Sequence, residues 1–201
     1  EALLKEVHHR VKNNLQVITS LLRLEAARGA QSDTKATLTA MQGRIRSMAL
    51  LHESLYRSGM FAAVDLGAYL RQIANQSFRS LVATPSPIRL ELDLVTVHVG
   101  MDHAIPCGLL VNELIANCLK HGFADQRAGE VRVELHREAT GQLRLRVSDT
   151  GAGLPPDFAD RRGDSLGLQL VSDLALQLQG TLEIGPGPAA IFTISFSPDP
   201  L

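Results

Sequence analysis

This sequence has almost no net charge and few cysteines. The formal net charge is -1 over 201 residues, so there is no basic field to favour nucleic acid or an anionic membrane. The two cysteines, Cys107 and Cys118, lie in an apolar helical stretch without the spacing of a zinc site. We expect both to be reduced core residues of a cytoplasmic protein.

Long apolar runs and a phosphate-binding loop are also missing. No run approaches the roughly 18 apolar residues that span a bilayer, and no signal peptide is visible. The pattern GxxxxGK does not occur, which excludes a P-loop as a nucleotide site. His98, His103 and His136 belong to no recognisable set of spaced ligands. Because Glu1 lies inside a helical pattern without a capping residue, we expect a further domain upstream of it.

What is present begins with two blocks of helical periodicity within residues 1–57, separated by a break at Gly29–Asp33. Two such helices cannot bury their apolar stripes completely in each other, so the pattern predicts a hairpin that dimerises into a four-helix bundle. The stripes are Leu4, Val7, Val11, Leu15, Ile18 and Leu22 in the first block, and Leu38, Met41, Ile45, Met48, Leu51 and Leu55 in the second.

The periodicity changes from about Val64. A helix over Leu66–Leu81 is followed by segments that alternate apolar and polar residues, which predicts a sheet with one buried face. Helices at about 102–121 and 166–179 can cover that face. The sequence therefore predicts an α+β chain with a helical domain over 1–60 and a two-layer α/β sandwich over 61–201. The expected strands are centred on Ile88–Leu94, Val131–Leu135, Leu143–Val147, Leu182–Ile184 and Phe192–Phe196.

The helix at 102–121 carries a polar stripe opposite its apolar side. Glu113, Asn117, Lys120 and His121 cluster on this stripe at about 100° per residue. Asn117 could hold a hydrated magnesium ion and Lys120 could contact phosphate oxygens, because magnesium takes few protein ligands and keeps water and phosphate. A solvated helix face remains the alternative for the helix alone.

Asp149 changes the balance between these alternatives. The strand parity of Leu143, Leu145 and Val147 carries its carboxylate to the inward side, where it needs hydrogen-bond donors. The exocyclic amine of adenine is a suitable donor. Gly151 and Gly153 would allow a base and ribose to approach the backbone, and Gly167 opens a helix whose free amides can receive phosphate.

The ordered segments "NELIANCLKHGF", "DTGAGLP" and "SLGLQLV" resemble the N, G1 and G2 boxes of the GHKL ATP-binding family. The resemblance implies ATP and Mg²⁺ as ligands, with Asn117 on the metal and Glu113 and Lys120 beside the triphosphate. It also implies a lid over Pro155–Ser165. No clear F box is present, and Ala190 stands where the family often has threonine. The residues that would contact adenine or shape its pocket and lid are Asp149, Gly151, Gly153, Gly167 and Leu168.

The histidine pair near the start decides between kinase and ATPase. Relative to the apolar stripe, His8 projects about 55° from its centre and His9 about 155° away. We therefore expect His8 to pack in the bundle and His9 to face solvent, in one stripe with Glu6 and Asn13. A neutral imidazole can attack a γ-phosphate in line, and Glu6 is the candidate proton acceptor.

The pattern Glu6-x-x-His9-Arg10-x-x-Asn13 resembles the H box of sensor histidine kinases related to the HWE subgroup. The resemblance implies ATP-dependent autophosphorylation of His9, and then transfer to an aspartate of a response-regulator receiver domain. It also implies that the domain expected upstream of Glu1 is a sensory domain. Arg10 departs from the commonest kinases, where an acidic residue follows the histidine. Two alternatives stay open. One is a phosphotransfer or docking module that no longer binds ATP, and the other is an ATPase in which Glu113 activates water.

Overall fold

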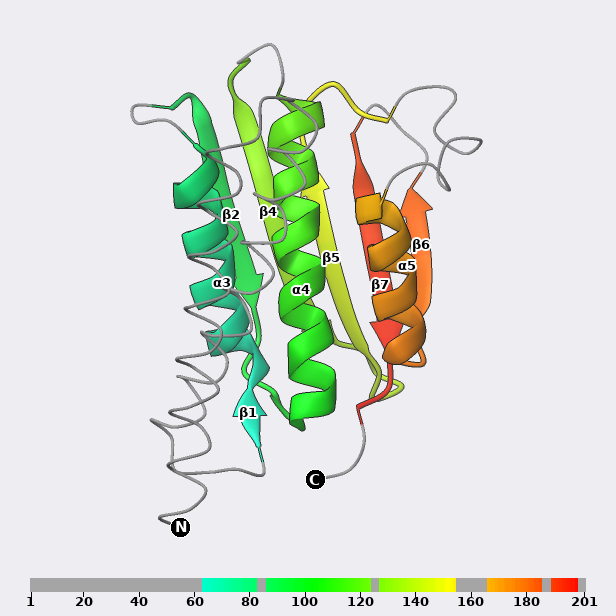
Figure 1. Ribbon diagram of the computed structural model, residues 1–201. Helices are drawn as coiled ribbons and strands as arrows, with labels where there is room; N and C mark the ends of the chain where they lie inside the picture. The colour runs from blue at the N-terminus through cyan, green and yellow to red at the C-terminus, as the bar shows by residue number, and fades with distance from the viewer. Residues whose placement is uncertain (1–62, 83–85, 124–126, 155–165, 186–188, 199–201) are drawn as a thin grey trace, which may run out of the picture.

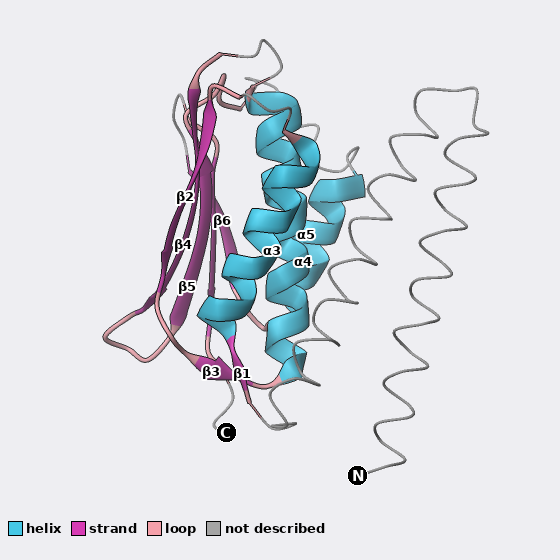
Figure 2. Ribbon diagram, turned by 90° about the vertical axis from the view of Figure 1, so that its left-hand side faces the viewer, coloured by secondary structure: helices cyan, strands magenta, loops and turns pink. Residues whose placement is uncertain are grey.

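The computed structural model describes residues 63–82, 86–123, 127–154, 166–185 and 189–198. In these residues three helices cover one face of a five-stranded sheet, and the opposite face carries no helix (Figures 1 and 2). The predicted α+β class, with its two-layer sandwich, is confirmed. The predicted helical hairpin, with Glu6, His8 and His9, lies outside the described residues, as does the predicted lid over 155–165.

The sheet has the strand order β2-β4-β5-β7-β6, and all five predicted strands are present. β2 pairs in parallel with β4, whereas the other neighbours pair antiparallel. Alternate residues of β4 and β5 are fully buried, as the period-two pattern predicts. The strands are β2 (Ile88–Leu94), β4 (Gly129–Arg137), β5 (Leu143–Asp149), β6 (Thr181–Gly185) and β7 (Ile191–Phe196).

The hairpin between β4 and β5 fixes which end of the sheet holds Asp149. The backbone N–H of Glu138 donates to the carbonyl of Gln142 at 2.8 Å, and the N–H of Gly141 donates to the carbonyl of Glu138 at 2.9 Å. From this turn β5 runs back along β4, so that Asp149 pairs with Val131 near the start of β4. The turn and Asp149 therefore lie at opposite ends of β5.

The helices are α3 (Leu66–Leu81), α4 (Met101–Asn117) and α5 (Leu166–Gln177). The sequence predicts α3 to the residue, and Asp65 caps it by accepting from the N–H of Ala68 at 3.1 Å. The predicted helix at 102–121 is regular only to Asn117, and then continues as a π-helical turn, η1 (Cys118–Gly122). Two short strands were not predicted: β1 (Val64–Asp65) pairs antiparallel with β3 (His98–Val99).

α3 packs against α4 and β2, and its buried apolar face includes Leu66, Leu70 and Ile73, each 1% exposed or less. Burying each of these side chains contributes roughly 1.5–3 kcal/mol. Near the end of α3, the hydroxyl of Ser77 donates to Oδ1 of Asn112 at 2.6 Å, inside the interface. α3 is therefore an integral part of the sandwich.

The described residues bear on two observations from the sequence: the state of the two cysteines and the lack of a long apolar run. Both cysteines are free and buried, as predicted, and burial raises the pKa of the Cys107 thiol. No helix in the described ranges has both the length and the apolar character needed to cross a bilayer.

Candidate nucleotide-binding site

Asp149 ends β5 with its side chain on the helix-covered face of the sheet, as its parity predicts. The residue is 3% exposed, and its Oδ1 accepts a hydrogen bond from the backbone N–H of Gly151 at 2.8 Å. Its Oδ2 is also buried and accepts no hydrogen bond from an N–H or O–H group. A buried carboxylate oxygen without a donor is costly. The exocyclic amine of adenine would supply the missing donor, so this oxygen fits the predicted role of Asp149.

The π-helical turn η1 brings the end of α4 against Asp149. A Cβ on Gly122 would lie 2.8 Å from Oδ1 of Asp149, so the backbone approaches the carboxylate at a point where a larger residue would collide. The Cys118 thiol, a weak donor, also lies beside this carboxylate: burial, then the negative charge of Asp149 and a hydrogen bond to its side chain, raise the pKa of the thiol. π-helical turns are rare and often occur at functional sites.

The segment after Asp149 is tied to the same turn. The N–H of Ala152 donates to the carbonyl of Gly122 at 2.8 Å, and a Cβ on Gly151 would collide with that carbonyl. Gly153 has φ of +75°, which glycine adopts without strain. Gly151 and Gly153 thus have structural reasons to be glycine, in addition to the predicted approach of a base and ribose.

The side chains of the predicted polar stripe become more exposed from Glu113 toward His121. Glu113 is 5% exposed and Asn117 is half-buried, whereas Lys120 and His121 are exposed. Partial desolvation of the ring, followed by the charge of Lys120, lowers the pKa of His121. The burial of Glu113 argues against a merely solvated helix face.

Gly167, in the first turn of α5, lies against the inner part of that stripe. A Cβ on Gly167 would be 3.4 Å from Oε2 of Glu113 and 3.8 Å from Oδ1 of Asn117. Two oxygen donors from consecutive turns of α4 therefore face the start of α5. Oxygen donors are the ligands that Mg²⁺ prefers, so this set fits the predicted magnesium site at Asn117. Leu168 is half-buried and packs against the hydrophobic core.

The structure thus brings Asp149, Gly151 and Gly153 together at one end of β5, and Glu113, Asn117 and Gly167 together between α4 and α5. Sequence reasoning treated Cys118 only as a core residue and did not single out Gly122. A glycine directly after the polar stripe was the available signal for Gly122. Contact of either residue with Asp149 depends on the π-helical turn, which periodicity did not predict.

A separate hollow of about 330 Å³ lies on the open face of the sheet. Its lining includes Arg132, Glu134, Arg146 and Ser148, which alternate with the core-facing residues of β4 and β5. It borders Asp149 but excludes Glu113, Asn117 and Gly167. The hollow is therefore not the candidate nucleotide site, which lies on the helix-covered face.

Comparison with known proteins agrees with this geometry. Residues 6–81 match a family described as histidine kinase, and residues 103–200 match the family of histidine kinase-, DNA gyrase B- and HSP90-like ATPases. The histidine kinase domain of the Erythrobacter litoralis EL346 blue-light-activated histidine kinase superposes with a TM-score of 0.72 at 30% identity, covering 96% of this chain and 92% of that one. The chain belongs to the histidine kinase family.

Two curated relatives are sensor or light-activated histidine kinases. The chain is 33% identical to the sensor histidine kinase PdtaS of Mycobacterium tuberculosis over 90% of its length. It is 32% identical to blue-light-activated histidine kinase 2 of Erythrobacter litoralis over 92% of this chain. The chain spans 36% of the first relative and 53% of the second. The resemblance to sensor histidine kinases with a GHKL-type ATP-binding domain is therefore confirmed.

Proposed function

We propose that this chain is the catalytic core of a sensor histidine kinase that phosphorylates its own His9 with ATP. The observation that carries the proposal is the buried Oδ2 of Asp149, which accepts no N–H or O–H hydrogen bond and lies in a domain of the ATP-binding family. A purely structural carboxylate at this depth would normally be fully hydrogen-bonded. The proposed division is a phosphotransfer and dimerisation domain over 1–60 and an ATP-binding domain over 61–201.

In this proposal Asp149 accepts the exocyclic amine of adenine, and the backbone at Gly151 and Gly153 lies along the base and ribose. Asn117 would hold Mg²⁺ through its side-chain oxygen, with Glu113 beside it. When bound, the ion neutralises charge on the phosphates. Lys120 contacts the triphosphate from the exposed end of the stripe, and Gly167 and Leu168 shape the pocket where α5 begins.

The transfer step joins the two halves of the chain. A nitrogen of the neutral His9 imidazole attacks the γ-phosphorus in line, so that a P–N bond forms and the bond between the γ-phosphorus and the bridging oxygen breaks. ADP leaves, and Glu6 accepts the proton released from the imidazole. The phosphoryl group then passes from His9 to an aspartate carboxylate of a receiver domain, which restores the free histidine.

Labelling with radioactive ATP and Mg²⁺ tests the assignment of His9. Wild type and His8→Gln are expected to become labelled, and His9→Gln is expected to remain unlabelled because its amide is not a nucleophile. Mass spectrometry under mildly alkaline conditions, where phosphohistidine survives, should find the phosphate on the peptide containing His9. Equal labelling of the His9→Gln variant would refute the assignment.

The same samples separate the kinase from the two alternatives. A docking module that no longer binds ATP would show no nucleotide affinity in a titration with fluorescent ATP. An ATPase that uses Glu113 to activate water would release phosphate steadily without forming a phosphoprotein. A kinase should bind nucleotide and accumulate labelled protein, and addition of a cognate receiver domain should remove that label.

A further inference from the structure

The open face of the sheet carries an ordered array of charges, with one exception. Along the parallel β2–β4 pair, Arg89 lies opposite Glu130 and Glu91 lies opposite Arg132. Opposite charges on facing strands stabilise a sheet, and like charges destabilise it. The third pair on this face, Asp93 opposite Glu134, joins two carboxylates. This pair therefore lacks the cation that each of the other two contains.

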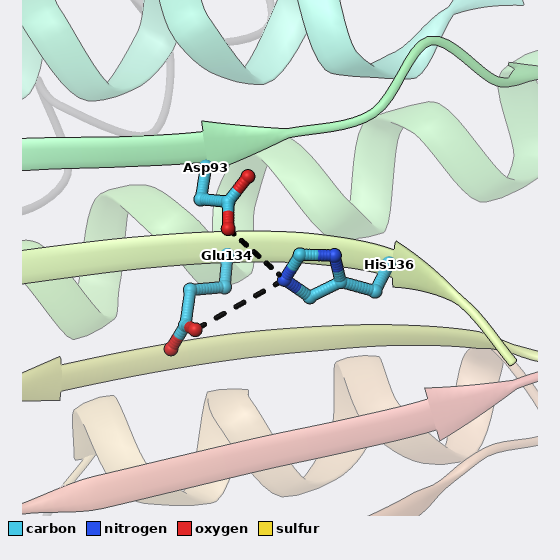
Figure 3. A group of neighbouring side chains, drawn as sticks. All are labelled: Asp93, Glu134 and His136. Carbon is cyan, nitrogen blue, oxygen red and sulfur yellow. Dashed lines mark ion pairs between the residues drawn. The ribbon is translucent and has the colours of Figure 1, made fainter.

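His136 completes a three-residue cluster with this acidic pair. It lies two residues after Glu134 on β4, and therefore on the same face of the sheet. Figure 3 shows the three side chains converging: Nε2 of His136 is 3.5 Å from Oδ2 of Asp93 and 4.0 Å from Oε1 of Glu134. One ligand atom from each residue lies within 4.8 Å of the other two.

These separations are close to those of a metal site. A tetrahedral ion with bonds of about 2.1 Å holds its ligand atoms roughly 3.4 Å apart, so a small contraction of the side chains would suffice. The cluster is also accessible, because the Asp93 side chain is 68% exposed and that of His136 is 41% exposed. An ion could therefore enter from solvent and retain water in its remaining coordination positions.

We propose that Asp93, Glu134 and His136 bind a divalent transition-metal ion of the Zn²⁺ class. One imidazole nitrogen with two carboxylate oxygens favours such an ion over Mg²⁺, which prefers ligands that are all oxygen. Glu134 binds through Oε1, while its Oε2 lies 3.6 Å from Nε of Arg146. Arg146 thus orients the ligand from outside the coordination sphere, as residues around metal sites commonly do.

The charged residues around the cluster determine how strongly it attracts a cation. Arg144 lies opposite His136 on β5, but its Nη1 is paired with Oε1 of Glu138 at 3.1 Å. Arg146 balances part of the charge on Glu134. Asp93 is the most exposed of the three ligands, and His136 is its one ion-pair partner among the described residues, so its charge is available to an added cation.

This site is separate from the proposed magnesium site. Glu134 pairs with Arg146 in the middle of β5 and points to the open face, whereas Asp149 ends β5 and points to the helix-covered face. The proposed ion would join β2, an edge strand, to β4. Its direct effect would be to hold that edge in place, and it would not require nucleotide.

Calorimetric titration of the chelator-treated full chain with ZnCl₂, without nucleotide, tests the proposal. We expect a binding event that is weakened at least about tenfold in both variants, since His136→Asn removes the imidazole ligand and Asp93→Asn removes the negative charge of a carboxylate ligand. His98→Asn is the matched control, because His98 is also an exposed strand histidine but lies outside the cluster. Millimolar Mg²⁺ should not displace the zinc.

Two further readouts separate a built site from non-specific binding. Co²⁺ should give visible absorption bands in wild type and in His98→Asn, and these bands should be lost in His136→Asn. Hydrogen exchange of the β2 amides should slow on addition of Zn²⁺ to wild type and to His98→Asn, but not to His136→Asn. No zinc binding in wild type, or binding that is unchanged in His136→Asn and Asp93→Asn, would overturn the proposal.

Discussion

The position of Asp149 shows how the alternation of side chains along one strand directs a carboxylate. Three apolar residues of β5 alternate with polar ones, and continuing this alternation by one step puts the carboxylate among buried side chains. The sequence thus predicts its direction and its need for a donor. It does not predict that one oxygen already accepts from Gly151 while the other accepts from no N–H or O–H group, because that depends on the turn after β5.

We expect Asp149→Asn to weaken ATP binding by about tenfold to a hundredfold, because an amide NH₂ in place of Oδ2 would face the adenine amine, donor against donor. Titration with a fluorescent ATP analogue measures this loss. Ser148→Ala is the matched control, since Ser148 is the preceding residue and lines the open face. An equal loss in both variants would mean that general damage to β5, and not adenine contact, causes the effect.

His121 should titrate below the ordinary histidine value of 6.5, because partial desolvation and Lys120 both lower its pKa. Between its folded pKa and 6.5 the unfolded chain binds more protons, so this contribution to stability is present above 6.5 and is lost as pH falls through the folded pKa. An NMR titration of the ring, with its resonances assigned by their loss in His121→Gln, should give a midpoint below 6.5. In His121→Gln, denaturation midpoints should decline less steeply on acidification.

The helices and strands themselves were largely predictable. α3, β2 and the alternating strands follow from simple periodicity and from the change at Val64. The elements that the sequence did not predict depend on pairing between distant segments or on a local departure from regular periodicity. β1 and β3 are two-residue strands with too short a pattern to detect, and η1 continues a helical pattern with altered geometry. The Asp93, Glu134 and His136 cluster was missed because it needs the register between β2 and β4.

The contact between α3 and α4 depends on a buried hydrogen bond. Ser77→Ala would leave Oδ1 of Asn112 buried without this donor, and should lower the free energy of unfolding by about 1–3 kcal/mol. Urea denaturation followed by circular dichroism measures the change. Ser80→Ala is the control, because Ser80 is exposed and its hydroxyl donates only to the carbonyl of Ser77. A loss in Ser80→Ala as large as that in Ser77→Ala would contradict this account.

The proposed domain boundary and the family match divide the chain differently. The histidine kinase match continues to residue 81 and so includes α3. Yet α3 packs on α4 and β2, and its buried side chains belong to the core of the sandwich. Sequence similarity follows the order of segments along the chain, whereas folding follows burial. We therefore keep the boundary at 60/61 as a prediction.

Two truncations distinguish these boundaries. The fragment 61–201 is expected to fold, bind ATP and remain unphosphorylated, because it retains α3 but lacks His9. The fragment 82–201 is expected to unfold or aggregate, because removing α3 uncovers the side chains of α4 that it buries. Circular dichroism and nucleotide titration measure both outcomes. A stable, ATP-binding 82–201 fragment would show that α3 belongs with the helical domain.

The same fragments test the predicted dimer. Light scattering should report a dimer for the full chain and a monomer for 61–201, since the predicted four-helix bundle requires residues 1–60 from both copies. A monomeric full chain that still labels His9 would show that the hairpin buries its stripes without a second copy. A dimeric 61–201 fragment would place the self-association surface on the sandwich.

The hairpin at Glu138–Gln142 has a practical use that follows from its position. It closes β4 and β5 at the end farthest from Asp149, and its turn residues are exposed or half-buried. A fluorescent reporter or affinity peptide grafted beside Gly141 would extend a surface turn without changing the strand parity that directs Asp149 inward. An insertion of one residue within β5 would instead reverse every side chain beyond it. The turn is therefore the natural grafting point for following this protein in cells.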